Sequence, residues 1–241
     1  MFDVRTVGTM FIEASQRDPA RPLLTYYDDG TGERTEVSAA TLGNWVAKTA
    51  NMLVDDCGLG TGNRAAVGLP PHWQTAAVLL ACWSAGLSVT MSAEPCDVAF
   101  VAAGGATHEW PAGDRYALGL HPMALPLRTA PDGYLDYTTE VRAHGDHFAP
   151  PVRVADDDVA WRDASGTTSH AELCARAADR ARELGIADGG RALVDADTHP
   201  DPLDWLLAPL AAGASVVLCR NTDNEALDTR AGVERVTVVV G

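Results

Sequence analysis

The chain has 241 residues and a mass of 25.4 kDa, with 46% hydrophobic and 21% charged residues, a balance typical of a folded globular protein and unlike a disordered chain. With 18 basic against 33 acidic residues the net charge is −15, which argues against nucleic acid or an anionic membrane surface as a partner. The apolar runs are too short to cross a bilayer, and the first residues lack a secretory signal pattern. Because the five cysteines show no CxxC spacing, we expect reduced thiols in a cytoplasmic protein.

In chain order, residue patterns predict a hairpin over 23–37 and then a helix that begins after Ser38 and stops at Gly58. A strand over 64–69, a helix over 72–85, and strands over 87–91 and 98–102 follow. Residues 106–158 are rich in Pro and Gly and are expected to form a crossover with a short strand and helix. Beyond it we expect a helix over 169–183, a strand over 191–194, a helix over 202–212 and strands over 215–219 and 236–240.

A unit of about 65 residues occurs twice, at 38–105 and 169–241. Displaced by 127 positions, the first copy matches the second at several places, among them Arg64 with Arg191 and His72 with His199. Strands that alternate with helices predict parallel βαβ units. We therefore expect an α/β fold of two repeated parallel-sheet subdomains with flanking helices. The first would span 1–105 with the N-terminal hairpin, and the second 159–241 after the crossover at 106–158.

Several motifs carry a family resemblance that covers nearly the whole chain. Residues 59–67 read LGTGNRAAV, and they are followed by LPP at 69–71 and CWSAG at 82–86. Residues 164–172 read ASGTTSHAE, and residues 210–218 read LAAGASVVL. In this order and spacing, the chain resembles the first half of the large domain of adenylate-forming enzymes, which include acyl-CoA synthetases. It also resembles a short actinobacterial family of unknown function that is distantly similar to AMP-binding enzymes.

The resemblance places a phosphate loop at Ser165, Gly166, Thr167 and Thr168. Where the family has a further glycine and a lysine, this chain has Ser169 and Glu172, so the charge beside a bound triphosphate would be reversed. Ser169-x-x-Glu172 is also the pattern of a capping box, in which each side chain binds a helix-terminal N–H group. The loop is therefore either a helix start or a residual anion site made by exposed N–H groups.

A possible ligand pocket is indicated by His72, His199 and Asp197. Each histidine follows a predicted strand, where α/β sheets collect ligands, and either can instead cap or pack at its turn. The resemblance puts His199 at an acyl-pocket histidine, and Asp195 or Asp197 is either its carboxylate partner or a solvated acid. The spacing His144-x-x-His147 lacks a third ligand, so we expect a solvated loop and no metal site.

The family's adenine-binding segment, ribose-binding aspartate, late catalytic lysine and lid domain would all lie beyond the equivalent of residue 241. The only lysine, Lys48, falls in the first predicted helix and cannot replace the catalytic one. We therefore expect a truncated, catalytically inactive AMP-binding-like module without catalytic residues, which binds a protein partner, a second copy or a small ligand. The alternative is an ATP-dependent acyl-activating ligase completed by another chain. ATP and Mg²⁺ are implied by the resemblance alone.

Overall fold

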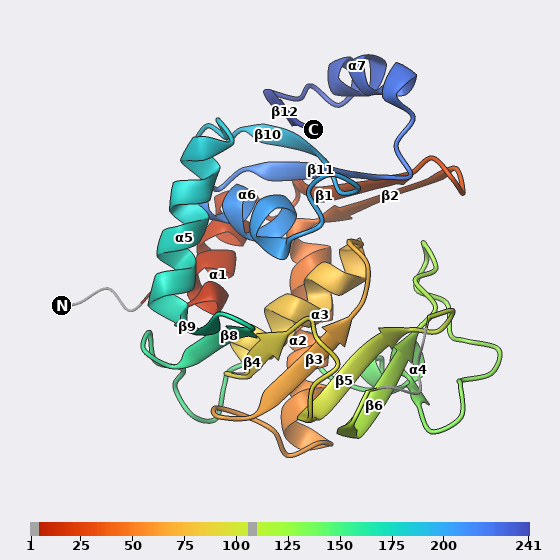
Figure 1. Ribbon diagram of the computed structural model, residues 1–241, viewed down its shortest axis with the longest axis vertical. Helices are drawn as coiled ribbons and strands as arrows, with labels where there is room; N and C mark the ends of the chain where they lie inside the picture. The colour runs from red at the N-terminus through yellow and green to blue at the C-terminus, as the bar shows by residue number, and fades with distance from the viewer. Residues whose placement is uncertain (1–4, 106–109) are drawn as a thin grey trace. The chain divides into compact units, whose positions relative to one another are not determined.

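The computed structural model describes residues 5–105 and 110–241 and divides the chain into two compact units (Figure 1). The first unit comprises residues up to Thr9, Gly43–Pro70 and Gln74–Leu173. The second comprises Met10–Leu42, Pro71–Trp73 and Cys174–Gly241. Two segments lie outside the described residues: residues 1–4, at which a secretory signal was considered, and residues 106–109 of the expected crossover. In the described part of the chain, no helix is long and apolar enough to span a membrane.

The first unit contains a seven-stranded sheet in the order β7-β6-β5-β3-β4-β8-β9. Its strands are β3 (Arg64–Gly68), β4 (Ser88–Thr90), β5 (Cys96–Ala102), β6 (Ala112–Leu118), β7 (Leu135–Asp136), β8 (Val159–Asp163) and β9 (Gly166–Ser169). All neighbours are parallel except β8 and β9, which form an antiparallel hairpin. The helices with residues in this unit are α1 (Val7–Arg17), α2 (Ala39–Asp55), α3 (Trp73–Ser84), α4 (Tyr137–Val141) and α5 (His170–Glu183).

Helix α3 is the centre of this unit's core. Every residue from 76 to 83 is fully buried, so the helix is apolar on all sides, as expected for a helix with no solvent face. The indole Nε1 of Trp83 donates to the carbonyl oxygen of Ala160 at 2.9 Å, which satisfies the one polar atom of that side chain. The helix and strand β8 are thereby fixed to each other.

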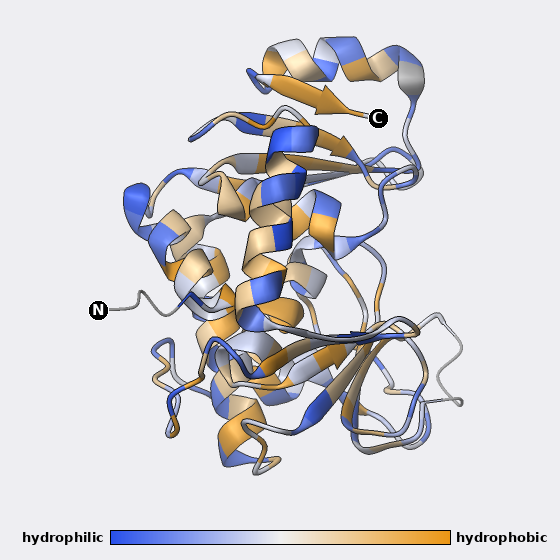
Figure 2. Cartoon of the chain, turned by 60° about the vertical axis from the view of Figure 1, so that its left-hand side comes forward, coloured by the Kyte–Doolittle hydropathy of each residue, from blue (hydrophilic) through white to orange (hydrophobic). Residues whose placement is uncertain are grey.

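The second unit contains a five-stranded sheet in the order β12-β10-β11-β1-β2. Its strands are β1 (Pro22–Asp28), β2 (Glu33–Ser38), β10 (Arg191–Asp195), β11 (Ser215–Arg220) and β12 (Val238–Val240). Its further helices are a π-helical turn, η1 (Leu203–Leu207), followed by α6 (Ala208–Ala211) and α7 (Asn224–Val233). Leu227 and Ala231 of α7 pack on Leu193, Val217 and Cys219 of the sheet. Strand β12 at the sheet edge consists of three valines and is hydrophobic throughout (Figure 2).

The two parallel βαβ units of the sheets have the same internal register. In β3 and β4, Arg64 pairs with Ser88, and in β10 and β11, Arg191 pairs with Ser215. Both pairs are related by the displacement of 127 seen in the sequence. The fold is thus mixed α/β with two parallel-rich sheets and flanking helices, as expected, while the repeat itself stays a prediction.

The expected segment boundaries do not follow the sheets. The hairpin β1–β2 was assigned to the first subdomain, but β1 pairs in parallel with β11 in the five-stranded sheet. Conversely, β8 and β9 were assigned to the second subdomain and instead extend the sheet of β3 and β4. An unpaired strand edge needs a partner for its N–H and C=O groups, and that partner can be distant in the sequence. Local patterns therefore predicted these strands without predicting where they pair.

Candidate functional site

The residues of the expected phosphate loop form the β8–β9 hairpin instead of an open loop. Thr167 and Thr168 pair with Arg162 and Trp161 across the ladder, and Gly166 pairs with Asp163. At the turn, the backbone N–H of Ser165 donates to the Asp163 carboxylate at 2.8 Å. This corrects the expectation of a loop, because ladder pairing with β8 draws these residues into a strand.

Ser169 and Glu172 form a capping box at the start of α5. The Ser169 backbone N–H donates to Glu172 Oε2 at 2.8 Å, and the Glu172 backbone N–H donates to Ser169 Oγ at 3.3 Å. These hydrogen bonds from the backbone and hydroxyl of Ser169 lower the pKa of the Glu172 carboxyl. The segment was expected to be either a helix start or a residual anion site, and in the structure it is a helix start.

The remaining N–H groups of the first turn of α5 are also occupied. His170 N donates to the carbonyl oxygen of Asp158 at 3.0 Å, and Ala171 N donates to that of Asp156 at 2.8 Å. A helix N-terminus binds an anion through N–H groups that lack partners within the helix. From Ser169 to Glu172 all four of these N–H groups have protein acceptors, so none is left to bind a phosphate.

The surrounding charge also disfavours a polyphosphate. Between residues 156 and 172 the chain has five carboxylates and one arginine, Arg162. The Arg162 guanidinium donates through Nε to Ser88 Oγ at 3.0 Å. These carboxylates make the electrostatic potential at the start of α5 negative, whereas a bound triphosphate is stabilised by a positive potential.

His170, the first residue of α5, is fully buried. Its Nδ1 accepts a hydrogen bond from the backbone N–H of Val7 at 3.3 Å, so the neutral ring carries its proton on Nε2. Burial lowers the pKa of His170 to about 4, and the charge of Asp158 opposes that shift only in part. No sequence pattern indicated a role for His170, and the only signal was its position directly after the capping Ser169.

Two further expectations in this unit concern Lys48 and the histidine pair. Lys48 Nζ donates to the carbonyl oxygen of His144 at 2.6 Å and lies 2.8 Å from the Asp146 carboxylate. The His144 ring lies 2.9 Å from Asp56 Oδ2, so this segment is attached to α2. Lys48 has a structural role here. Within residues 5–105 and 110–241, no group of three His, Cys, Asp or Glu side chains is arranged to hold a metal ion.

In the second unit, the carboxyl ends of β1, β10 and β11 meet at one sheet edge, where Asp28, Asp195 and Arg220 end their strands. Asp195 Oδ1 accepts from the Thr222 hydroxyl at 2.8 Å, and Asp197 Oδ2 accepts from the Thr222 backbone N–H at 3.0 Å. The turns that follow β10 and β11 are thereby tied together. This is the edge at which ligands bind in open α/β sheets.

The two histidines of the expected pocket have different environments. His72 is buried beside Tyr26, edge to face at 4.6 Å, and its Nε2 lies 3.6 Å from Glu33 Oε1. Burial lowers the pKa of His72, although the nearby Glu33 opposes this shift. His199 is half-buried, and its ring nitrogen Nδ1 lies 3.0 Å from the Thr198 hydroxyl. The carboxylates of Asp195 and Asp197, the expected partners of His199, accept hydrogen bonds from Thr222, whereas the His199 ring is placed against Thr198.

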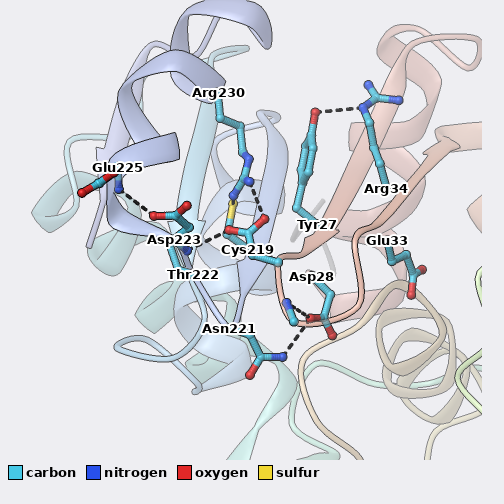
Figure 3. A network of polar contacts seen from close by, with 12 residues as sticks. Tyr27, Asp28, Glu33, Arg34, Cys219, Asn221, Thr222, Asp223, Glu225 and Arg230 are labelled. Atoms are coloured by element: carbon cyan, nitrogen blue, oxygen red, sulfur yellow. Dashed lines mark hydrogen bonds and ion pairs between the residues drawn. The ribbon is translucent and has the colours of Figure 1, made fainter.

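A network of charged side chains stabilises this edge (Figure 3). Arg230 lies over the Tyr27 ring at 4.3 Å and forms an ion pair with Asp29 at 2.6 Å. The Arg34 Nε donates to the Tyr27 hydroxyl at 2.8 Å from the opposite side of the ring. Asn221 donates to Asp28 Oδ1 at 2.8 Å. The strand ends are thus fixed by contacts that the sequence patterns did not reveal.

Comparison with solved structures identifies the fold. An acyl-CoA synthetase of Brucella canis superposes with a TM-score of 0.75 at 17% identity, over 95% of this chain and 46% of that one. Acetoacetyl-CoA synthetase from Streptomyces lividans gives 0.75 at 20% identity, over 97% of this chain and 42% of that one. The N-terminal domain of FACL13 from Mycobacterium tuberculosis gives 0.71 at 14% identity, over 98% and 62%. The chain has the fold of the N-terminal portion of adenylate-forming enzymes and spans about half the length of the synthetases it matches.

The family is shown by a curated relative. A protein of Mycobacterium tuberculosis (strain ATCC 25618 / H37Rv), described as a TIGR03089 family protein, is 39% identical over 247 residues, which cover 97% of each chain. This chain therefore belongs to the TIGR03089 family. No family model matches it.

Proposed function

We propose that this protein is a non-catalytic binding module built on the fold of the adenylate-forming enzymes. The observation that carries the proposal is the closed start of α5, where the four N–H groups from Ser169 to Glu172 all have protein acceptors. Activation of an acyl group by ATP requires cations and donors that hold the phosphates at the transition state. At the corresponding place this chain has a hairpin, a capping box and a surplus of carboxylates.

Two surfaces of the five-stranded sheet support a binding role. The carboxyl edge brings Asp195 and Asp197 together with Thr222 and is the place for a small ligand. His199 lies in the segment that follows β10 at this edge, and the His72 ring packs on Tyr26 of β1. At the side of the sheet, β12 is an edge strand with Val239 half exposed, an edge to which a partner protein or a second copy can add.

The second candidate is an ATP-dependent acyl-activating ligase completed by another chain. It is favoured by one observation, that the chain aligns with about half of each synthetase. The start of α5 would then have to open, because its donors are occupied in the structure described here.

Exchange of labelled pyrophosphate into ATP, measured with a panel of short, long and aromatic carboxylic acids, separates the two candidates. We expect no exchange above a protein-free blank for any acid, with an active acyl-CoA synthetase as the positive control. Acid-dependent exchange by the purified chain would refute the non-catalytic proposal. Sedimentation velocity on the same sample tests for a second copy.

A further inference from the structure

A cavity lies at the amino end of the five-stranded sheet, on the edge opposite Asp28 and Asp195. Its volume is about 430 Å³, and it is lined by Arg21 and Pro22 at the start of β1, Arg191 at the start of β10 and Thr237 just before β12. This volume falls within the range of roughly 300–1,000 Å³ typical of small-molecule sites. No expectation from the sequence pointed to this place.

Two of the arginines that line the cavity are held in place by the protein. Arg21 donates to the carbonyl oxygens of Gly189 and Gly190 at 3.2 and 3.1 Å. Arg191 donates to Thr25 Oγ1 at 2.8 Å and to Glu234 Oε2 at 2.6 Å. Both arginines also donate to Ser215 Oγ, Arg21 at 3.1 Å and Arg191 at 3.2 Å. Each guanidinium has five N–H groups, so Nε and one N–H of Nη1 remain as donors on each.

The cavity has a local surplus of positive charge in a chain whose net charge is −15. Its lining includes two carboxylates, Glu36 and Glu234, against Arg21, Arg191 and Arg235. Arg34, which belongs to the network around Tyr27 and does not line the cavity, pairs with both carboxylates, at 2.8 Å to Glu36 and 2.9 Å to Glu234. Three guanidinium groups therefore line the cavity against two carboxylates, both of which are already paired with Arg34.

Arg235 is the arginine of the cavity lining that is exposed at its mouth. It follows the C-terminus of α7 with a φ of +54°, a left-handed conformation that glycine adopts without strain and arginine does not. Its side chain is exposed at the cavity, and within the described residues no carboxylate lies within ion-pair distance of it. Hydrogen bonds from Arg235 N to Gly232 O at 3.2 Å and from Val236 N to Ala231 O at 2.9 Å form a Schellman cap of α7, which holds Arg235 in this conformation at the cavity.

We propose that this cavity binds a small organic anion through a phosphate or carboxylate group, with Arg21 and Arg191 as the fixed donors and Arg235 as the donor at the mouth. Arg235, which is exposed at the cavity, can offer two parallel N–H bonds to either ligand group, and Arg21 and Arg191 add single N–H donors and positive charge. The site is independent of the proposed function, since it uses neither α5 nor the carboxyl edge of the sheet.

The test is calorimetric titration of the full chain with pyrophosphate and, separately, with citrate, at low ionic strength. The informative variant is Arg235→Gly, which removes the donor and relieves the left-handed strain, so that it is expected to fold at least as well as the parent. The matched control is Arg182→Gln, which removes an exposed arginine of α5, 77% accessible, in the same unit.

We expect saturable binding of at least one probe by the parent and by Arg182→Gln. Arg235→Gly should weaken it about tenfold or more, the effect of losing a hydrogen bond to a charged group. Preference for pyrophosphate over citrate would identify a phosphate ligand, and the reverse a carboxylate. No saturable binding of either probe at 10 mM (about the weakest affinity of interest), or equal weakening by both variants, would overturn the proposal.

Discussion

Protonation of His170 should destabilise the folded chain at mildly acidic pH. The folded protein holds the pKa of His170 at about 4, whereas in the unfolded chain it returns to about 6.5. Because the unfolded state takes up the proton first, stability is unaffected well above pH 6.5 and falls as the pH drops from about 6.5 towards 4. Protonation would also place a donor at Nδ1, opposite the N–H of Val7 that it now accepts.

The size of the effect follows from the two pKa values. Between pH 7 and pH 4.5, linkage gives a loss of about 2 kcal/mol from this one histidine. His72, whose pKa is also lowered by burial, destabilises the folded chain in the same direction as the pH falls below about 6.5. The contribution of His170 must therefore be isolated by a variant rather than read from the total.

His170→Asn provides that isolation, because an amide oxygen can accept from Val7 N near the position of Nδ1 and does not titrate. Urea unfolding of both proteins, followed by circular dichroism at half-unit steps from pH 7 to 4.5, gives the free energies of unfolding. The variant should be less stable at pH 7 but should lose about 2 kcal/mol less than the parent over this range. Parallel pH profiles for the two proteins would refute the assignment of a buried neutral His170.

Four other substitutions have defined outcomes in the same unfolding assay. Gly68→Ala would place its Cβ against the indole ring of Trp110 and should cost about 1–3 kcal/mol. Gly43→Ala in α2, with nothing within 4 Å, should be neutral or stabilise by up to about 1 kcal/mol, and equal effects of the two substitutions would contradict the close approach at Gly68. Arg235→Gly should stabilise by about 1 kcal/mol, and a loss of stability would show that the left-handed conformation carries no strain. Burial raises the pKa of Glu234, but hydrogen bonds from Tyr27, Arg191 and Arg34 outweigh it and hold the pKa at about 2, so its stabilisation is present above pH 4.5 and is lost as the pH falls towards 2. Glu234→Gln should abolish the loss of stability that protonation of Glu234 causes below pH 4.5. A pH profile of the variant that matches the parent in this range would show that Glu234 makes no such contribution.

The helix starts and the βαβ units were predictable because their signals are local. Ser38 accepts from the N–H of Thr41 at 3.1 Å, and Ser169 caps α5, at the positions that the sequence pattern indicates. In each βαβ unit, short apolar segments alternate with helical periodicity, and the structure has strands and helices there. Two helices were missed: α1, which follows the chain start, and α7, whose cap is Asp223.

What the sequence could not predict depends on residues far apart in the chain. The β1–β11 pairing joins residues about 190 positions apart, and the cavity gathers arginines from positions 21, 191 and 235. The start of α5 was indicated by Ser169 and Glu172, but not the carbonyl groups of Asp156 and Asp158 that occupy its other donors. Local patterns specify elements and caps, whereas a site depends on tertiary pairing that those patterns do not encode.

The most direct test of the non-catalytic account is thermal unfolding with and without millimolar Mg-ATP. It is best made in the Arg235→Gly background, in which phosphate binding in the cavity is weakened about tenfold or more. A ligand at 100 times its dissociation constant adds about 2.7 kcal/mol, which is roughly 5–10 °C for a chain of this size. The closed start of α5 predicts no shift with Mg-ATP, and a shift of 5 °C or more (about 2 kcal/mol) would contradict it.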